Sequence, residues 1–163
     1  MTPAWSDEEY AYGATVNGNQ LTSGIISDSI QPPLSDVSNS WTALFKKVHD
    51  TYDAKAPFDG NVLYGEAVAY TFVQAMLKAG RNPTRADLVN AINAGLPQGP
   101  AVAPYAYSST DHAGVTGAYM GVITNGVLTQ QGSVLTTDAT ASGAITTVTA
   151  SQQAAPTSGI PSP

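Results

Sequence analysis

The stretch from Ser40 to Gly95, SWTALFKKVHDTYDAKAPFDGNVLYGEAVAYTFVQAMLKAGRNPTRADLVNAINAG, decides the fold because its apolar residues recur at helical spacing. The pattern predicts three consecutive helices, over residues 39–54, 61–79 and 84–94. Each helix carries one apolar stripe, and a stripe of this kind normally faces a core. We expect nine large side chains of these stripes to be mostly buried: Trp41, Leu44, Phe45, Val48, Phe72, Val73, Met76, Leu88 and Ile92.

Capping residues mark the ends of the predicted helices. Ser38 or Ser40 can cap the first helix, because a serine oxygen can accept a hydrogen bond from a free N–H of the first turn. Thr84 is followed three residues later by Asp87, which predicts an acidic version of the capping box. Gly80 stands where a left-handed C-cap is expected to end the second helix.

The sequence on either side of the helices has β character. Residues 22–30 and 102–107 read as short strands, and residues 118–124 and 127–129 flank Asn125-Gly126, a strong signal for a hairpin turn. One hairpin cannot cover the apolar faces of three helices, so we expect a parallel sheet that would cover them to lie outside this sequence. The predicted fold class is α/β, incomplete as given.

Composition excludes several classes of function. The chain has 163 residues, a formal net charge of −6 and only six Lys and Arg residues, so its surface should repel nucleic acid. There is no cysteine, which excludes disulfides and thiolate metal sites. No apolar run is long enough to span a bilayer. The opening MTPAWSDEEY is not a signal peptide, so export would need a signal that this sequence lacks.

The chain divides into three regions by composition. Residues 1–21 form a polar N-terminal segment, and residues 22–138 hold the predicted helices and strands. Residues 139–163 contain no charged side chain and consist largely of Ala, Thr, Ser, Gln, Gly and Pro, which is typical of a linker or tail. Within this tail only residues 144–150 could form a strand, and that strand would lie at a sheet edge.

Two groups of polar residues are weak candidates for chemistry. Asp111 and His112 follow a run of hydroxyl side chains, but a catalytic triad is assembled from distant segments. We therefore interpret this segment as a polar loop in which Asp111 makes an Asx turn. His49 and Asp53 are four residues apart and could share a metal ion, but no third ligand is near in sequence. We interpret them as an exposed pair near a helix C-terminus, and we expect no metal and no cofactor.

Glu66 is the most interesting acidic residue, since the helix around it is almost free of charge. It could favour the positive end of the helix dipole, or it could meet a ligand ammonium at a cleft. In the second case, Glu66→Gln in the full-length parent protein should weaken ligand binding at least about tenfold. If Glu66 only interacts with the helix dipole, the same substitution should lower stability and leave ligand binding unchanged.

The region from Gly24 to Asp138 resembles the C-terminal portion of the type I periplasmic binding proteins, and more narrowly the branched-chain amino-acid-binding subunits of ABC transporters. The segments that carry the resemblance are GIISDSI, the helical stretch from Ser40 to Gly95 and the hairpin region YSSTDHAGVTGAYMGVITNGVLT. Within the helical stretch, FVQAMLKAGRNPTRADLVNAI is similar to a common form of the family. Complete members have two αβ lobes and about twice this length, so the resemblance implies a fragment without most of the ligand site.

The resemblance implies an extracytoplasmic protein that captures an amino acid or a similar small polar ligand between two lobes and delivers it to the membrane permease, with no catalytic residues. Family members often have a tyrosine near the start of the long helix, on the cleft side. Alignment on Ala79-Gly80 places Glu66 at that position, with Tyr64 close by, so these two residues are the predicted ligand contacts. The alternatives are a self-associating module that covers its apolar helix faces with other copies, and a small hydrolase that uses Asp111 and His112.

Overall fold

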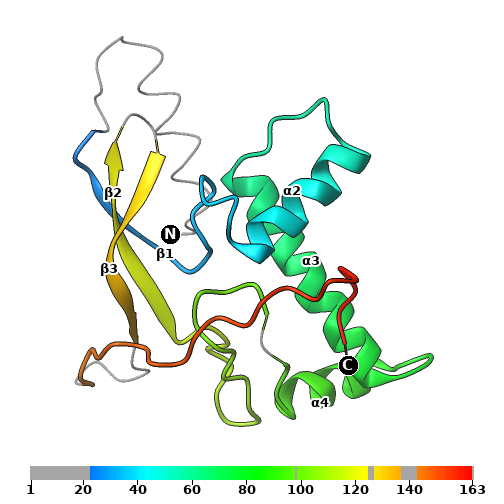
Figure 1. Cartoon of the computed structure of the whole chain (residues 1–163). Coiled ribbons are helices and arrows are strands. Elements are labelled where there is room, and N and C mark those ends of the chain that lie inside the picture. The colour runs from blue at the N-terminus through cyan, green and yellow to red at the C-terminus, as the bar shows by residue number, and fades with distance from the viewer. Residues whose placement is uncertain (1–22, 98, 125–126, 137–142, 163) are drawn as a thin grey trace.

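The computed structural model describes residues 23–97, 99–124, 127–136 and 143–162. These residues form three helices, α2 (Ser40–Tyr52), α3 (Gly60–Ala79) and α4 (Arg85–Asn93), and three strands, β1 (Ile26–Ser29), β2 (Gly117–Thr124) and β3 (Val127–Thr136). The sheet lies on one side and the helices on the other, with the C-terminal segment running between them (Figure 1). The structure is mixed α/β, which is compatible with the predicted class. Within the described residues, no helix is both long and apolar enough to cross a membrane.

The helices begin and end close to the predicted positions. Asn39 rather than a serine caps α2, and its side chain accepts a hydrogen bond from Trp41 N at 3.0 Å. The two serines have other partners, since Ser38 Oγ donates to Asp36 and Ser40 Oγ accepts from Ala155 N. The capping box of Thr84 with Asp87 is confirmed.

Gly80 does end α3, but with φ 89° and ψ −168°. This is not the left-handed helical conformation that was expected. It belongs to a region of backbone space that is essentially open only to glycine.

The sheet is antiparallel, with β2 between β1 and β3. The hairpin is confirmed, because Thr124 pairs with Val127, although Asn125 and Gly126 lie outside the described residues. Two expectations are wrong in part: the first strand is shorter than residues 22–30, and β3 continues well beyond residue 129.

The predicted strand over residues 102–107 is wrong. This segment belongs to a loop that touches its neighbour through a single bridge between Tyr105 and Val115. Val102 packs instead with Tyr119, Ile123 and Leu128 beneath the sheet. Within the described residues no strands pair in parallel.

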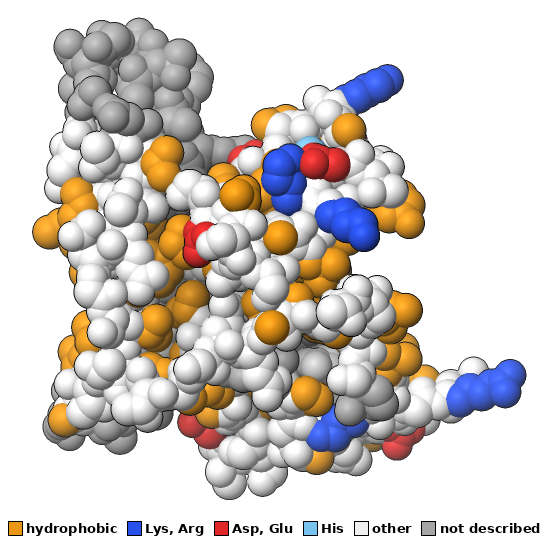
Figure 2. All heavy atoms as spheres, in the orientation of Figure 1, with side chains coloured by type: hydrophobic (Ala, Val, Ile, Leu, Met, Phe, Trp, Pro, Cys, Tyr) orange, Lys and Arg blue, Asp and Glu red, His pale blue; other side chains and the backbone are white. Residues whose placement is uncertain are grey.

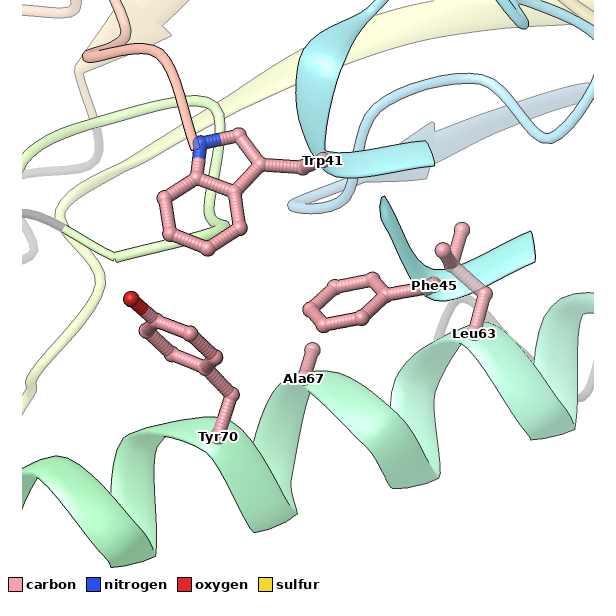
Figure 3. Close-up of a cluster of buried hydrophobic side chains, with 5 residues drawn as sticks. All are labelled: Trp41, Phe45, Leu63, Ala67 and Tyr70. Carbon is pink, nitrogen blue, oxygen red and sulfur yellow. The ribbon is translucent and has the colours of Figure 1, made fainter. Parts of the chain in front are cut away.

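The helical core lies between α2 and α3 (Figure 3). Trp41 stands edge-on to Tyr70, with ring centroids 4.9 Å apart, and Phe45 lies 6.0 Å from Trp41. Leu63 and Ala67 complete this core from α3. The prediction of burial is confirmed for Trp41 and Phe45.

Burial is wrong for three of the nine side chains, since Val48, Phe72 and Val73 are exposed. Four others, Leu44, Met76, Leu88 and Ile92, are half-buried. For Phe72 and Val73 the physical reason is that α3 is apolar on nearly all sides and packs through a different stripe. Its most buried side chains beyond the core residues are Gln74 and Ala75, so the larger aliphatic residues remain on the outer side.

Residues 143–162 connect the two halves of the molecule. Thr146 O accepts from Thr136 N at 2.7 Å and Val148 N donates to Val134 O at 2.8 Å, so the segment first follows the edge of β3. This agrees with the prediction of edge-strand character at residues 144–150, although only an isolated bridge forms there. The chain then crosses to α2, as Figure 1 shows in orange to red.

The C-terminal segment makes specific contacts with the start of α2 and with the loop before β2. Gln152 Oε1 accepts from Asn39 Nδ2 at 2.8 Å, and Gln152 Nε2 donates to Pro100 O at 2.8 Å. Gln153 O accepts from the Trp41 indole at 2.7 Å. Ala155 both donates to Ser40 and packs against the helical core. Composition alone does not reveal these contacts.

Candidate ligand site

A pocket of about 290 Å³ lies beside α3, on the side that faces the loop before β2. Nine of its lining residues are aliphatic or phenylalanine, and Phe72 is the largest of them. The others are polar but uncharged: Gln31, Tyr64, Thr71, Tyr105 and Tyr107. A concave, mainly apolar surface with a few polar groups is the usual form of a small-molecule site.

One face of α3 and the loop before β2, which contains Gly99 and Gly114, form the walls of this pocket. Tyr64, Val68, Thr71 and Ala75 recur at helical spacing and therefore lie along the same side of α3. Gly114 allows the tyrosine rings of the loop to lie against the backbone, since a Cβ there would overlap the ring of Tyr107. Gly99 does the same for Tyr105.

Gly114→Ala should therefore disturb the pocket and lower stability by about 1–3 kcal/mol, the usual cost of an overpacked site. Gly65→Ala is the matched control, because a Cβ at that position of α3 meets nothing within 4 Å. Alanine has the higher helix propensity, so the control should gain up to about 1 kcal/mol. Urea unfolding measures both changes. A neutral Gly114→Ala variant would contradict the packing described here.

A chain of hydroxyl groups crosses the pocket wall. Tyr105 Oη lies 2.7 Å from Thr71 Oγ1, and Thr71 Oγ1 donates to the carbonyl of Ala67 at 2.9 Å. Burial raises the pKa of Tyr105 to about 12. Tyr105 therefore stays neutral at any physiological pH.

The two predicted ligand contacts lie in different surroundings. Tyr64 lines the pocket, whereas Glu66 is not among the lining residues. Successive helical residues are about 100° apart, so side chains two positions apart point in nearly opposite directions. The structure therefore does not bring Tyr64 and Glu66 together.

Glu66 does not act as a helix cap either. That role belongs to Asp59, whose carboxylate accepts a hydrogen bond from Val62 N at 2.9 Å. Glu66 lies further along α3, and its Oε2 is buried without a hydrogen-bond partner among the described residues. Burial raises the pKa of Glu66 to about 7, and the charge of His49 opposes the rise.

Lowering the pH from about 8 to about 5 should stabilise the protein through Glu66. Because its folded pKa of about 7 lies above the ordinary value of 4.5, the folded state binds the proton more tightly. The stabilisation is complete when the pH is below 4.5, the ordinary pKa of a glutamate, and it is lost as the pH rises through about 7. Since Glu66 is partly exposed, we expect a discounted effect of about 1 kcal/mol.

Thermal melts of the wild type and of Glu66→Gln test this pH dependence. The variant should melt higher than the wild type at pH 8, and its melting temperature should vary less between pH 5 and pH 8. Equal slopes for the two proteins would show that titratable groups other than Glu66 cause the change.

His49 differs from its sequence interpretation. It is buried rather than exposed, its Nδ1 lies 3.1 Å from Asp50 Oδ1, and its ring lies 5.4 Å from that of Phe58. The expectation of an exposed pair with Asp53 is therefore wrong for His49. In the part of the chain that the structure describes, no group of three or more potential ligands could hold a metal ion.

The segment around His112 has the predicted form of a polar loop. Asp111 makes the expected Asx turn, since its Oδ1 accepts from Ala113 N at 2.8 Å, and Ser108 Oγ accepts from Asp111 N at 3.0 Å. The His112 side chain is exposed and has no hydrogen-bond partner among the described residues. The loop therefore holds no preformed contact between a nucleophile and a base.

Sequence reasoning did not identify Thr71, Tyr105 or Gln31 as site residues. The sequence offers one signal for this loop, which is the presence of Gly99 and Gly114 near Tyr105 and Tyr107. Glycines close to tyrosines can indicate that a ring approaches the backbone. No family model, no curated protein and no solved structure matches this chain.

Proposed function

We propose that this chain is a fragment of an extracytoplasmic solute-binding protein that serves an ABC transporter permease, and that it carries part of the ligand site. The observation that carries the proposal is the pocket beside Tyr64, which has about 290 Å³ for a small molecule. Small-molecule pockets typically have roughly 300–1,000 Å³, so this pocket suits a compound of amino-acid size. The resemblance of residues 24–138 to type I periplasmic binding proteins supplies the transport context, and the pocket offers binding groups without an evident nucleophile.

Thermal-shift screening with small solutes tests this proposal. A ligand present at 100 times its dissociation constant adds about 2.7 kcal/mol of stability, which is readily measured. The panel should contain branched-chain and aromatic amino acids together with uncharged compounds of similar size. A shift of the melting temperature with any member supports solute binding, and no shift across the panel contradicts it.

Variants then locate the binding site. Tyr64→Ala removes a ring from the pocket wall and should weaken binding of any compound identified by at least about tenfold. Tyr52→Ala is the control, since Tyr52 lies at the exposed end of α2 and does not line the pocket. An equal loss of affinity in Tyr64→Ala and Tyr52→Ala would show that the ligand does not bind in this pocket.

A second candidate function is self-association. It is favoured by exposed apolar side chains along α3 and on α4: Val68, Phe72, Val73, Leu77 and Val89. Exposed apolar surface commonly marks a contact with another protein where it forms a large patch. Figure 2 shows hydrophobic side chains, in orange, at the surface in several places over the helices.

Sedimentation equilibrium tests self-association. The proposal requires an apparent mass that rises with protein concentration, and Val73→Lys should prevent the rise because a charge would have to enter the contact. Val73 does not line the pocket, so this variant should leave ligand binding intact. A monomer at all concentrations would exclude this candidate.

A further inference from the structure

The direction of the hydroxyl chain in the pocket wall is fixed by its last member. The carbonyl of Ala67 can only accept, so the single hydroxyl hydrogen of Thr71 is used in the 2.9 Å bond to it. Thr71 Oγ1 must then act as the acceptor in the 2.7 Å contact with Tyr105, and Tyr105 must be the donor. The only hydrogen of the Tyr105 hydroxyl is therefore occupied. What remains at Tyr105 Oη is the capacity to accept a hydrogen bond.

The charge of the pocket limits its ligand further. None of the described lining residues is Asp, Glu, Lys, Arg or His. An ammonium or carboxylate group placed there would lose its hydration without gaining a counter-charge, and this loss is costly. Glu66, the nearest candidate for pairing with an ammonium in the sequence interpretation, does not line the pocket. The walls instead offer aromatic and aliphatic surface from Phe72 and its neighbours.

From these two observations we infer that the pocket selects a small, uncharged, mainly apolar compound that presents an N–H or O–H donor to Tyr105. This inference rests on the proposed function and changes its ligand class from a zwitterionic amino acid to a neutral molecule. A ligand with a donor adds one more hydrogen bond to the existing chain. A ligand with only an acceptor would leave a lone pair facing a lone pair.

Indole and 1-benzofuran are suitable probes, because they are neutral, have nearly the same shape and differ in a ring N–H against a ring oxygen. L-Tryptophan and L-leucine provide the zwitterionic comparison. Calorimetric titration of the full chain should show that indole binds at least about tenfold more tightly than 1-benzofuran, which corresponds to about 1.4 kcal/mol. Both amino acids should bind more weakly than indole.

Two substitutions at Thr71 test the direction of the hydroxyl chain. Thr71→Val keeps the shape of the side chain but removes the acceptor for Tyr105, whose hydrogen then becomes available to the ligand. The preference for indole should fall below about threefold, mainly through tighter binding of 1-benzofuran. Thr71→Ser retains the hydroxyl and should keep the preference, which controls for any disturbance of α3. Tyr105→Phe should also remove the preference, because it removes the acceptor itself.

The possible results separate this inference from the proposed function. If an amino acid binds and indole does not, the ligand class is overturned and solute binding stands. If indole and 1-benzofuran bind equally to the wild type, the role of Tyr105 as acceptor is overturned. If Thr71→Val and Thr71→Ser both keep the full preference for indole over 1-benzofuran, the proposed direction of the hydroxyl chain is overturned. If no compound binds to the folded protein, both the inference and the proposed function fail.

Discussion

Trp41→Ala is expected to lower the free energy of unfolding by about 3–5 kcal/mol, the usual cost of removing a large aromatic side chain from a core. Trp41 is 1% exposed and stands edge-on to Tyr70 at 4.9 Å. Its indole N–H also donates to Gln153 O at 2.7 Å, so the substitution removes both packing and a hydrogen bond. Phe45, 3% exposed in the same core, should respond to alanine similarly.

Chemical denaturation measures the effect of Trp41→Ala, with two controls. Trp41→Phe keeps an aromatic ring and loses the indole N–H, so it should cost clearly less than alanine. Tyr52→Ala removes an aromatic side chain that is 84% exposed, and it should change stability by no more than about 0.5 kcal/mol. A loss below about 1 kcal/mol for Trp41→Ala would show that the α2–α3 core is not packed as described.

Truncation after Ser151 should destabilise the protein by about 3 kcal/mol or more. The truncated chain loses the contacts of Gln152 with Asn39 and Pro100, the bond from the Trp41 indole and the bond from Ala155 to Ser40. Each neutral hydrogen bond contributes about 0.5–1.5 kcal/mol, and a buried donor left without a partner costs more than that. The truncation also uncovers the part of the helical core against which Ala155 packs.

Truncation after Gly159 is the matched control. It removes Ile160, which is mostly exposed, and keeps the contacts made by residues 152–155. Its melting temperature should stay close to that of the full chain, while truncation after Ser151 should lower the melting temperature by several degrees. Equal stability of the two truncated chains would mean that residues 152–155 do not support α2.

The helices could be predicted from the sequence because their signals are local. Apolar periodicity placed α2, α3 and α4 to within two residues, and Thr84 with Asp87 defined a cap without reference to the rest of the chain. The buried face of α3 could not be predicted in the same way. Its stripe through Ala67 and Gln74 is less apolar than the stripe through Phe72 and Val73, and only the position of α2 decides between them.

The candidate site was predictable only in part. Tyr64 was identified through the resemblance and does line the pocket. Tyr105 and Thr71 are 34 residues apart, so their contact depends on the path of a long loop that has no regular pattern in the sequence. The surroundings of Glu66 depend on α2, because His49, whose charge opposes the rise of the Glu66 pKa, comes from that helix. Contacts between distant segments are therefore what the sequence could not supply.

The contacts of the C-terminal segment have a consequence for the order of folding during synthesis. Asn39, Ser40 and Trp41 bind residues that follow them by 112 to 115 positions. A ribosome releases these late residues well after α2 and α3 have left the exit tunnel, since synthesis adds roughly 5–20 residues per second. For several seconds the nascent helices carry an unpaired indole and an uncovered core edge. We expect this interval to be the period in which the chain is most open to chaperone binding and to aggregation.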